Sequence, residues 1–255
     1  MQTVTTIAEL RRHLDAARAV GRTVGLVPTM GYLHAGHESL MVRASAECDD
    51  VVATIFVNPL QFAPDEDLDA YPRTFEADCE LLRPLGVELV FAPTVAGMYP
   101  NGQRTMIHPG PAGAILDGIS RPTHFAGMLT VVNKLLSIAN PNAAYFGEKD
   151  YQQLVLIKQM ADDLNLGVEI VGVPTVRESD GLAMSSRNRY LDDAQRQLAT
   201  TLSAALVAGA HVAAQGRDAI LATARAVVES HPDIAVEYIE LRGRMLEEAP
   251  EAGDG

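Results

Sequence analysis

Short apolar runs alternate with longer helical patterns from residue 23 to residue 173, and this alternation constrains the fold most. The runs occupy residues 23–27, 51–57, 88–91, 143–146 and 168–171. The run at 51–57 is β-branched and apolar on both faces, which is typical of a parallel strand buried between two layers. Strands that alternate with helices predict an α/β domain built on a parallel sheet.

A turn with two glycines and two histidines follows the first run, at residues 28–37, and a helix is predicted after it at 38–46. Strand, glycine-bearing turn and helix form a common phosphate site, where we expect free N–H groups and the helix dipole to face the anion. His34 and His37 are three residues apart, so their rings should point the same way. At this point half a metal site and two unrelated surface histidines stay open as alternatives.

Three further polar segments lie at strand ends or near the predicted domain boundary: Gln61 within 56–62, Lys149 and Gln153 within 147–153, and residues 184–188. The amide of Gln61 suits a small polar substrate, and the Lys149 ammonium suits a phosphate. In isolation, the alternatives are a solvated glutamine, a surface ion pair and a serine turn before a helix. Parallel sheets bind ligands at the carboxyl ends of their strands, which favours one shared site.

Composition narrows the class of protein. The chain has 255 residues, 47% of them hydrophobic, which is enough for a sizeable core. A net charge of −13 argues against a nucleic-acid partner. No run of 18 apolar residues or signal-peptide pattern is present, and the two cysteines have no disulfide spacing, so we expect a cytoplasmic protein without a membrane segment.

Local patterns predict several further elements. Thr6 and Glu9 form a capping box before the first helix, and Asp192 is a candidate N-cap for a helix reaching about residue 214. A short strand is expected at 106–108. After residue 175 the chain changes character: two alanine-rich helices and a half-buried strand at 235–241 predict a second, smaller domain.

Five motifs taken together carry a family resemblance: P-T-M-G-x-L-H-x-G-H, F-V-N-P-x-Q-F, Y-P-R-T, G-E-K-D-x-Q-Q and M-S-S-R-N. In this order, over residues 1 to about 241, the chain resembles the pantoate–β-alanine ligase family. The resemblance implies a Rossmann-like domain at 1–175 that binds ATP and pantoate, a C-terminal α+β lid domain at 176–255, and a homodimer. The family usually continues with another strand, so we expect the lid domain to lack its last strand.

The family reaction condenses pantoate with β-alanine through pantoyl adenylate, using ATP with Mg²⁺. The resemblance implies that His37, the residue given as the acid in such enzymes, acts with His34 and Lys149, that Gln61 and Gln153 bind pantoate, that Gln61 also contacts β-alanine, and that Asp78 lies near the metal. The implied ATP-binding residues are Met30, Gly31, Tyr32, Leu33, His34, Ala35, Gly36, His37, Gly147, Glu148, Lys149, Asp150, Val176, Met184, Ser185, Ser186 and Arg187.

Two other functions stay open beside the ligase. A nucleotidyltransferase of the same fold would release a stable adenylylated product, although the two glutamines favour a small carboxylate substrate. A nucleotide sensor without catalysis is the second alternative, and the presence of His34, His37, Lys149 and Arg187 argues against it.

Overall fold

The structure, a computed structural model, describes residues 1–64 and 66–249. The chain divides into two compact units, Met1–Thr175 and Val176–Gly255. Residues 250–255, the end of the predicted lid domain, lie outside the described ranges, as does Asp65. No helix within those ranges combines the length and apolar character needed to cross a membrane.

The first unit is built on a six-stranded sheet with the order β1-β4-β3-β2-β5-β6, in which every pair of neighbours is parallel. This confirms the predicted α/β class. The strands are β1 (Gln2–Val4), β2 (Val24–Thr29), β3 (Asp50–Ile55), β4 (Leu89–Phe91), β5 (Ala143–Gly147) and β6 (Glu169–Val173). Sequence patterns missed β1, because a three-residue edge strand is recognisable only through its pairing with β4.

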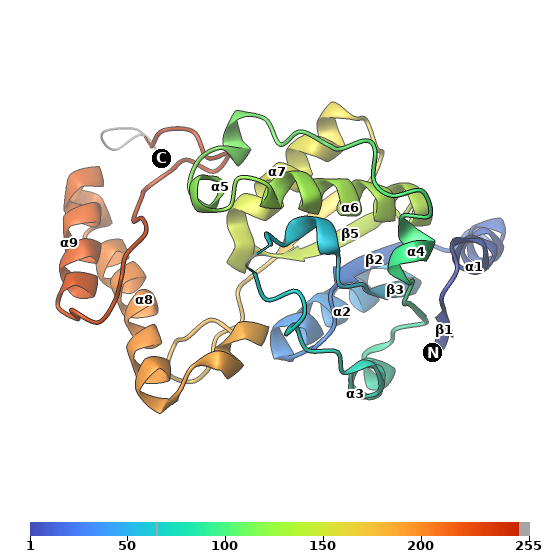
Figure 1. Cartoon of the computed structure of the whole chain (residues 1–255), viewed down its shortest axis with the longest axis horizontal. Helices are drawn as coiled ribbons and strands as arrows, with labels where there is room; N and C mark the ends of the chain where they lie inside the picture. Colours follow the sequence, from blue (N-terminus) through green and yellow to red (C-terminus); the bar gives the residue numbers. More distant parts are fainter. Residues whose placement is uncertain (65, 250–255) are drawn as a thin grey trace. The chain divides into compact units, whose positions relative to one another are not determined.

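Helices cover both faces of the sheet (Figure 1). Leu26 of β2 belongs to one hydrophobic cluster with residues of α6 (His124–Ala139) and α7 (Tyr151–Asp163), whereas its neighbour Val27 belongs to the other, with residues of α2 (Ala35–Glu47). The helices of this unit are α1 (Ile7–Ala19), α2 (Ala35–Glu47), α3 (Phe75–Leu82), α4 (Val95–Met98), α5 (Asp117–Ser120), α6 (His124–Ala139) and α7 (Tyr151–Asp163). The capping box at Thr6 and Glu9 is confirmed at the start of α1.

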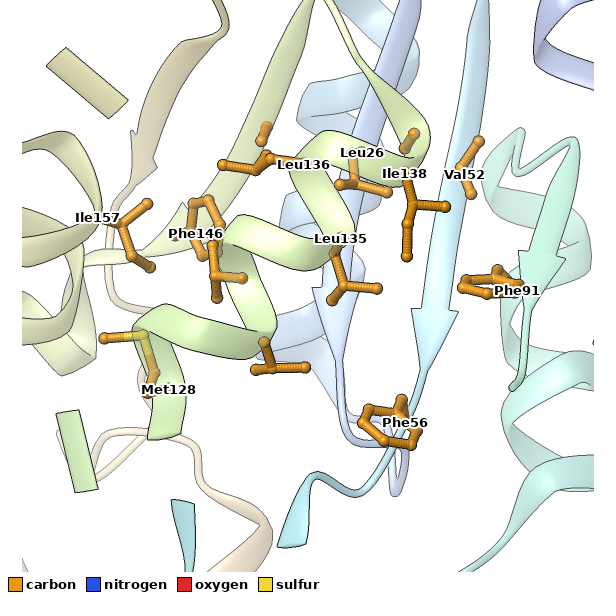
Figure 2. Close-up of a cluster of buried hydrophobic side chains, with 14 of the residues drawn as sticks. Leu26, Val52, Phe56, Phe91, Met128, Leu135, Leu136, Ile138, Phe146 and Ile157 are labelled. Carbon is orange, nitrogen blue, oxygen red and sulfur yellow. The ribbon is translucent and has the colours of Figure 1, made fainter. Parts of the chain in front are cut away.

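The larger hydrophobic cluster lies between the sheet and α6. Figure 2 shows Leu135, Leu136 and Ile138 of this helix facing strand residues such as Leu26 and Val52. Eleven of the sixteen residues of α6 are buried. Burial of that many side chains explains why this segment is apolar nearly all round, and it fixes the helix against the sheet.

The strand predicted at 106–108 is wrong. The segment has no regular structure, and the N–H of Ile107 donates to the hydroxyl of Thr130 at 2.9 Å. An extended segment becomes a strand only when a neighbouring strand pairs with its backbone, and here a side chain of α6 takes that place.

The second unit contains α8 (Asp193–His211) and α9 (Arg217–Glu229), and Asp192 caps α8 as predicted. The strand predicted at 235–241 is wrong: no strand is assigned between 176 and 249, where only two isolated bridges occur. Arg225 of α9 instead donates to the carbonyl of Ile239 at 3.0 Å. Within residues 176–249 no strand lies alongside residues 235–241, so the backbone of this alternating segment has no partner strand.

Candidate active site

Three of the predicted polar segments begin where adjacent strands end. Strand β2 ends at Thr29, β3 at Ile55 and β5 at Gly147, and β2 lies between the other two. The chain runs outward from β2 to β3 and β4 and then crosses to β5 on the other side. In an open parallel sheet this reversal leaves a crevice at the carboxyl edge, where ligands bind.

The two histidines pair through their backbone and their rings. His34 is the N-cap of α2, and its Nδ1 accepts from the N–H of Gly36 at 3.1 Å. The Nδ1 of His37 accepts from the N–H of His34 at 3.3 Å, and the ring centroids are 4.1 Å apart. Because each Nδ1 accepts a hydrogen bond, the proton of each neutral ring is assigned to Nε2. Both residues therefore keep one N–H donor for a ligand.

Both imidazoles are held in the neutral form. The pKa of His37 is lowered to about 3, mainly by burial and then by the neighbouring His34 and Lys149, against the opposing effect of Asp150. The pKa of His34 is also lowered, first by burial and then by Lys149. Both rings sit in the first turn of α2, where the helix dipole also disfavours a cation. This geometry favours two neutral donors over a protonated acid.

The turn itself uses most of its backbone donors. The N–H of Gly31 donates to the Thr29 hydroxyl at 3.2 Å, and the N–H groups of Tyr32 and Leu33 donate to the Asp78 carboxylate at 3.0 and 2.8 Å. Gly36 donates to His34, and His37 donates to the carbonyl of His34. The expectation that free N–H groups of this helix start face the phosphate is thus wrong for these residues, because the protein already satisfies them.

Asp78, predicted to lie near the metal, is surrounded by hydrogen-bond donors of the protein. Its carboxylate accepts from two backbone N–H groups and from the Thr74 hydroxyl at 3.2 Å. Across the described ranges, no group of three or more His, Cys, Asp or Glu side chains could hold a metal ion. Three of the roughly four lone-pair sites of this carboxylate are thus occupied by the protein itself, which leaves little capacity for a metal ion.

Gln61 is fixed by three neighbours. It ends the 3₁₀ helix η1 (Pro59–Gln61), its Nε2 contacts the Met30 sulfur at 3.3 Å, and its Oε1 accepts from Asn58 at 3.1 Å. The ring of His124 holds the Gln61 carbonyl at 2.9 Å. These contacts place Gln61 beside Met30, next to the histidine turn.

Asn58 is a site residue that sequence reasoning missed. It is 1% exposed, and it accepts from the Tyr99 hydroxyl at 2.8 Å and donates to the carbonyl of Gly127 at 3.2 Å. Burial raises the pKa of Tyr99 to about 12, so this hydroxyl remains a donor. The available signal was an asparagine directly before a proline at a strand end, a residue type that often caps the next turn.

Lys149 and the two glutamines after it differ in their surroundings. Lys149 lies in η4 (Glu148–Asp150) and pairs with Asp150 at 3.0 Å, and its charge acts on the pKa of both histidines. Gln153 is half-buried, and within the described chain its side chain makes no hydrogen bond. Gln152 is buried and donates to the carbonyls of Ala112 and Ile115. Gln153 therefore has its amide available for a ligand, whereas Gln152 supports the fold.

In the second unit, Val176 and Met184 face each other, since the N–H of Met184 donates to the carbonyl of Val176 at 3.0 Å. Ser185 caps the 3₁₀ helix η5 (Ser186–Tyr190), and its hydroxyl accepts from the N–H of Arg187 at 3.3 Å. This is the serine turn that the sequence left open as an alternative. A capping role for Ser185 is compatible with ligand binding by its neighbours.

The fold and the first-unit site define a class of protein: an α/β nucleotide-binding protein with paired histidines and a lysine at the carboxyl edge of a parallel sheet. The family model described as pantoate-beta-alanine ligase matches residues 2–253. The chain therefore belongs to the pantoate–β-alanine ligase family, and it is a ligase.

Individual relatives agree. The chain is similar to a pantothenate synthetase of Rhodococcus jostii, with 67% identity over 96% of this chain and 79% of the relative, and to one of Nocardia farcinica, with 63% identity over 94% and 75%. The solved pantothenate synthetase of Thermus thermophilus is 46% identical, with a TM-score of 0.94 over 100% of this chain and 92% of that one. A pantoate-beta-alanine ligase from Francisella tularensis, solved with a β-γ ATP compound and β-alanine, is 41% identical, with a TM-score of 0.76 over 80% and 78%.

Proposed function

We propose that the protein joins pantoate to β-alanine at the expense of ATP in two steps. In the first, a carboxylate oxygen of pantoate bonds to the α-phosphorus of ATP while the bond to pyrophosphate breaks, which leaves pantoyl adenylate. In the second, the β-alanine amine bonds to the acyl carbon, loses a proton and displaces AMP. The observation that carries this proposal is the neutral histidine pair beside Lys149 at the carboxyl edge of the sheet.

The roles of the first-unit residues follow from their chemistry. Attack of one anion on another requires neutralised charge and alignment more than covalent help. The Nε2–H groups of His34 and His37 donate to phosphate oxygens, and Lys149 supplies the positive charge. Because its pKa is about 3, His37 serves as a neutral donor and not as a proton source. Met30–His37 and Gly147–Asp150 shape the ATP site around these groups.

Gln61 and Gln153 bind pantoate. Gln153 has an amide with no protein partner in the described ranges, and Gln61 is held rigidly beside Met30. An amide both donates and accepts, so it can bind either the hydroxyls or the carboxylate of pantoate. Gln61 also contacts the incoming β-alanine.

The remaining roles rest on the family resemblance. Val176 contacts adenine, Met184–Arg187 bind the nucleotide and its phosphates, and residues 176–255 serve as a lid domain. Mg²⁺ enters with ATP and is carried mainly by the triphosphate, which agrees with the absence of a three-ligand acidic cluster from the described residues. A homodimer and a cytoplasmic location stay predictions.

The decisive experiment measures exchange of labelled pyrophosphate into ATP. Exchange that requires pantoate and proceeds without β-alanine is expected, because only the first step returns pyrophosphate. A nucleotidyltransferase would exchange with another acceptor instead, and a nucleotide sensor would bind ATP without exchange. Either result would overturn the proposal.

A further inference from the structure

We propose that Asp78 is a positioning residue of the ATP-binding turn: from α3 it holds the backbone of Tyr32 and Leu33, and so sets the direction of His34 and His37. This inference goes beyond the residue roles above and rests on the proposed ATP-dependent reaction. Asp78 is 3% exposed, and a buried carboxylate is tolerated only when donors surround it. Those donors are the N–H groups of Tyr32 and Leu33 and the hydroxyl of Thr74.

The turn has a strained backbone conformation, which the contacts to Asp78 help to hold. Gly31 has φ +84° and Tyr32 has φ +51°, so two successive residues are in the left-handed region. Tyr32 carries a side chain and therefore adopts this region at a cost. The N–H groups of Tyr32 and Leu33, which follow one another in the chain, both donate to a single anion. In this protein the anion is the carboxylate of Asp78.

The fit between the turn and Asp78 is tight. A Cβ added to Gly31 would lie 2.9 Å from Oδ2 of Asp78 and 3.1 Å from Cγ2 of Ile55. The turn is therefore packed against both α3 and the end of β3. His34 and His37 follow directly after Leu33, so a change in the backbone of residues 31–33 moves the two Nε2–H donors.

This arrangement also keeps phosphate away from the N–H groups of the turn. A phosphate placed against the N–H groups of Tyr32 and Leu33 would have to displace, or lie against, the Asp78 carboxylate. This segment therefore binds the triphosphate through the Nε2–H groups of His34 and His37. Asp78 acts through the turn and need not touch ATP.

The test compares Asp78→Asn with Glu76→Gln, which removes an exposed charge from the same helix. The amide that replaces the carboxylate would have to face its NH₂ group toward one of the two backbone N–H donors. In the pyrophosphate exchange assay we expect the KM for ATP to rise roughly 10- to 100-fold, with the KM for pantoate and the melting temperature changed much less. Glu76→Gln should behave as wild type.

A magnesium titration separates positioning from metal binding. If Asp78 were a metal ligand, Asp78→Asn would need more free Mg²⁺ for half-maximal exchange, and excess Mg²⁺ would restore activity. We expect an unchanged Mg²⁺ requirement. Restoration by Mg²⁺, or a normal KM for ATP in the folded variant, would overturn the inference.

Gly31→Ala provides a second variant that leaves the charge in place. The added methyl group forces the turn away from Asp78, so the KM for ATP should rise here too. If Asp78→Asn does not fold, the KM of Gly31→Ala for ATP tests the proposal by itself. A normal value would refute the role of the contact between the turn and Asp78. Absence of pantoate-dependent exchange in the wild-type protein would instead contradict the proposed function.

Discussion

His37 is a histidine that the protein keeps neutral at physiological pH. His37 is half-buried, its Nδ1 is occupied by a backbone N–H, and Lys149 opposes a second positive charge. A neutral imidazole can still donate from Nε2, and a donor held in place costs no reorganisation during the reaction. Its expected contribution is therefore stabilisation of charge on the phosphate.

His37→Gln tests this role, because an amide nitrogen of glutamine can approach the position of Nε2. His37→Ala should slow pantoate-dependent pyrophosphate exchange roughly 100- to 1,000-fold. His37→Gln should retain clearly more activity than the alanine variant. Lys149→Ala should lose activity to a similar extent as His37→Ala. Equal inactivity of the glutamine and alanine variants would point to proton transfer by His37 instead.

The same group predicts how stability depends on pH. The pKa of His37 is lowered from 6.5 to about 3 in the folded protein, so below pH 6.5 the unfolded chain binds a proton that the folded chain does not. The contribution of neutral His37 to the free energy of unfolding is therefore fully present above pH 6.5, and it is lost progressively as the pH falls toward 3. When the pH is lowered from 7.5 to 5.0, the free energy of unfolding measured in urea should fall by about 1–2 kcal/mol more for the wild type than for His37→Gln. An equal fall in the free energy of unfolding of the two proteins would show that His37 is not held neutral in the folded state.

Gln152 and Gln153 are neighbours with different predicted roles. Gln153→Ala should raise the KM for pantoate with little effect on ATP use or melting temperature, and Gln61→Ala should also weaken pantoate use. Gln152→Ala removes buried hydrogen bonds to the carbonyls of Ala112 and Ile115, so it should lower the free energy of unfolding by about 1–3 kcal/mol. Pantoate titrations and urea unfolding on all three variants separate binding from stability.

At the scale of elements, η1 and α6 meet at Gly127. A Cβ at this position would lie 2.0 Å from the carbonyl oxygen of Leu60, and the carbonyl of Gly127 itself accepts from Asn58. Backbone therefore packs directly on backbone. This close approach holds Gln61, the last residue of η1, at a constant distance from the start of α6.

Gly127→Ala should destabilise the protein by about 3 kcal/mol, because overpacking outweighs the better helix propensity of alanine. The control is Ser137→Ala, an exposed position of the same helix, which should be neutral or slightly stabilising. The measurement is urea unfolding, followed by the KM for pantoate on the folded fraction. An unchanged free energy of unfolding in Gly127→Ala would mean that η1 can move away from α6 without loss of stability.

At the scale of the whole molecule, Arg187 tests the proposed role of the second unit in the reaction. We predict that Arg187→Ala raises the ATP requirement of pantoyl adenylate formation and leaves the second step largely intact when pantoyl adenylate is supplied. The reason is that the β- and γ-phosphates leave before β-alanine attacks, so a group that binds them no longer contributes. Both half-reactions must be measured separately. Equal loss in the two would assign Arg187 to the fold or to the acyl adenylate.

Local patterns in the chain were sufficient for much of the fold. The capping box at Thr6 and the N-cap at Asp192 depend only on residues close in the sequence, and both are present. The buried strands and the amphipathic helices around them were likewise recognisable from their spacing. The strands predicted at 106–108 and 235–241 failed for the opposite reason, since a strand depends on a partner that its own sequence does not contain.

The residues of the candidate site likewise fall into those recognisable from the sequence and those whose role depends on tertiary contacts. The sequence alone determined the α/β class, the histidine turn, and Lys149, Gln61 and Gln153 as candidate ligand-binding residues, because these follow from residue type and from position after a strand. Only the tertiary structure decided that both histidines are neutral, that Asn58 is buried against Tyr99 and Gly127, and that the Asp78 carboxylate holds the turn. Each of these depends on burial or on contacts between residues at least 41 positions apart, and such contacts exist only once the sheet has brought its strand ends together.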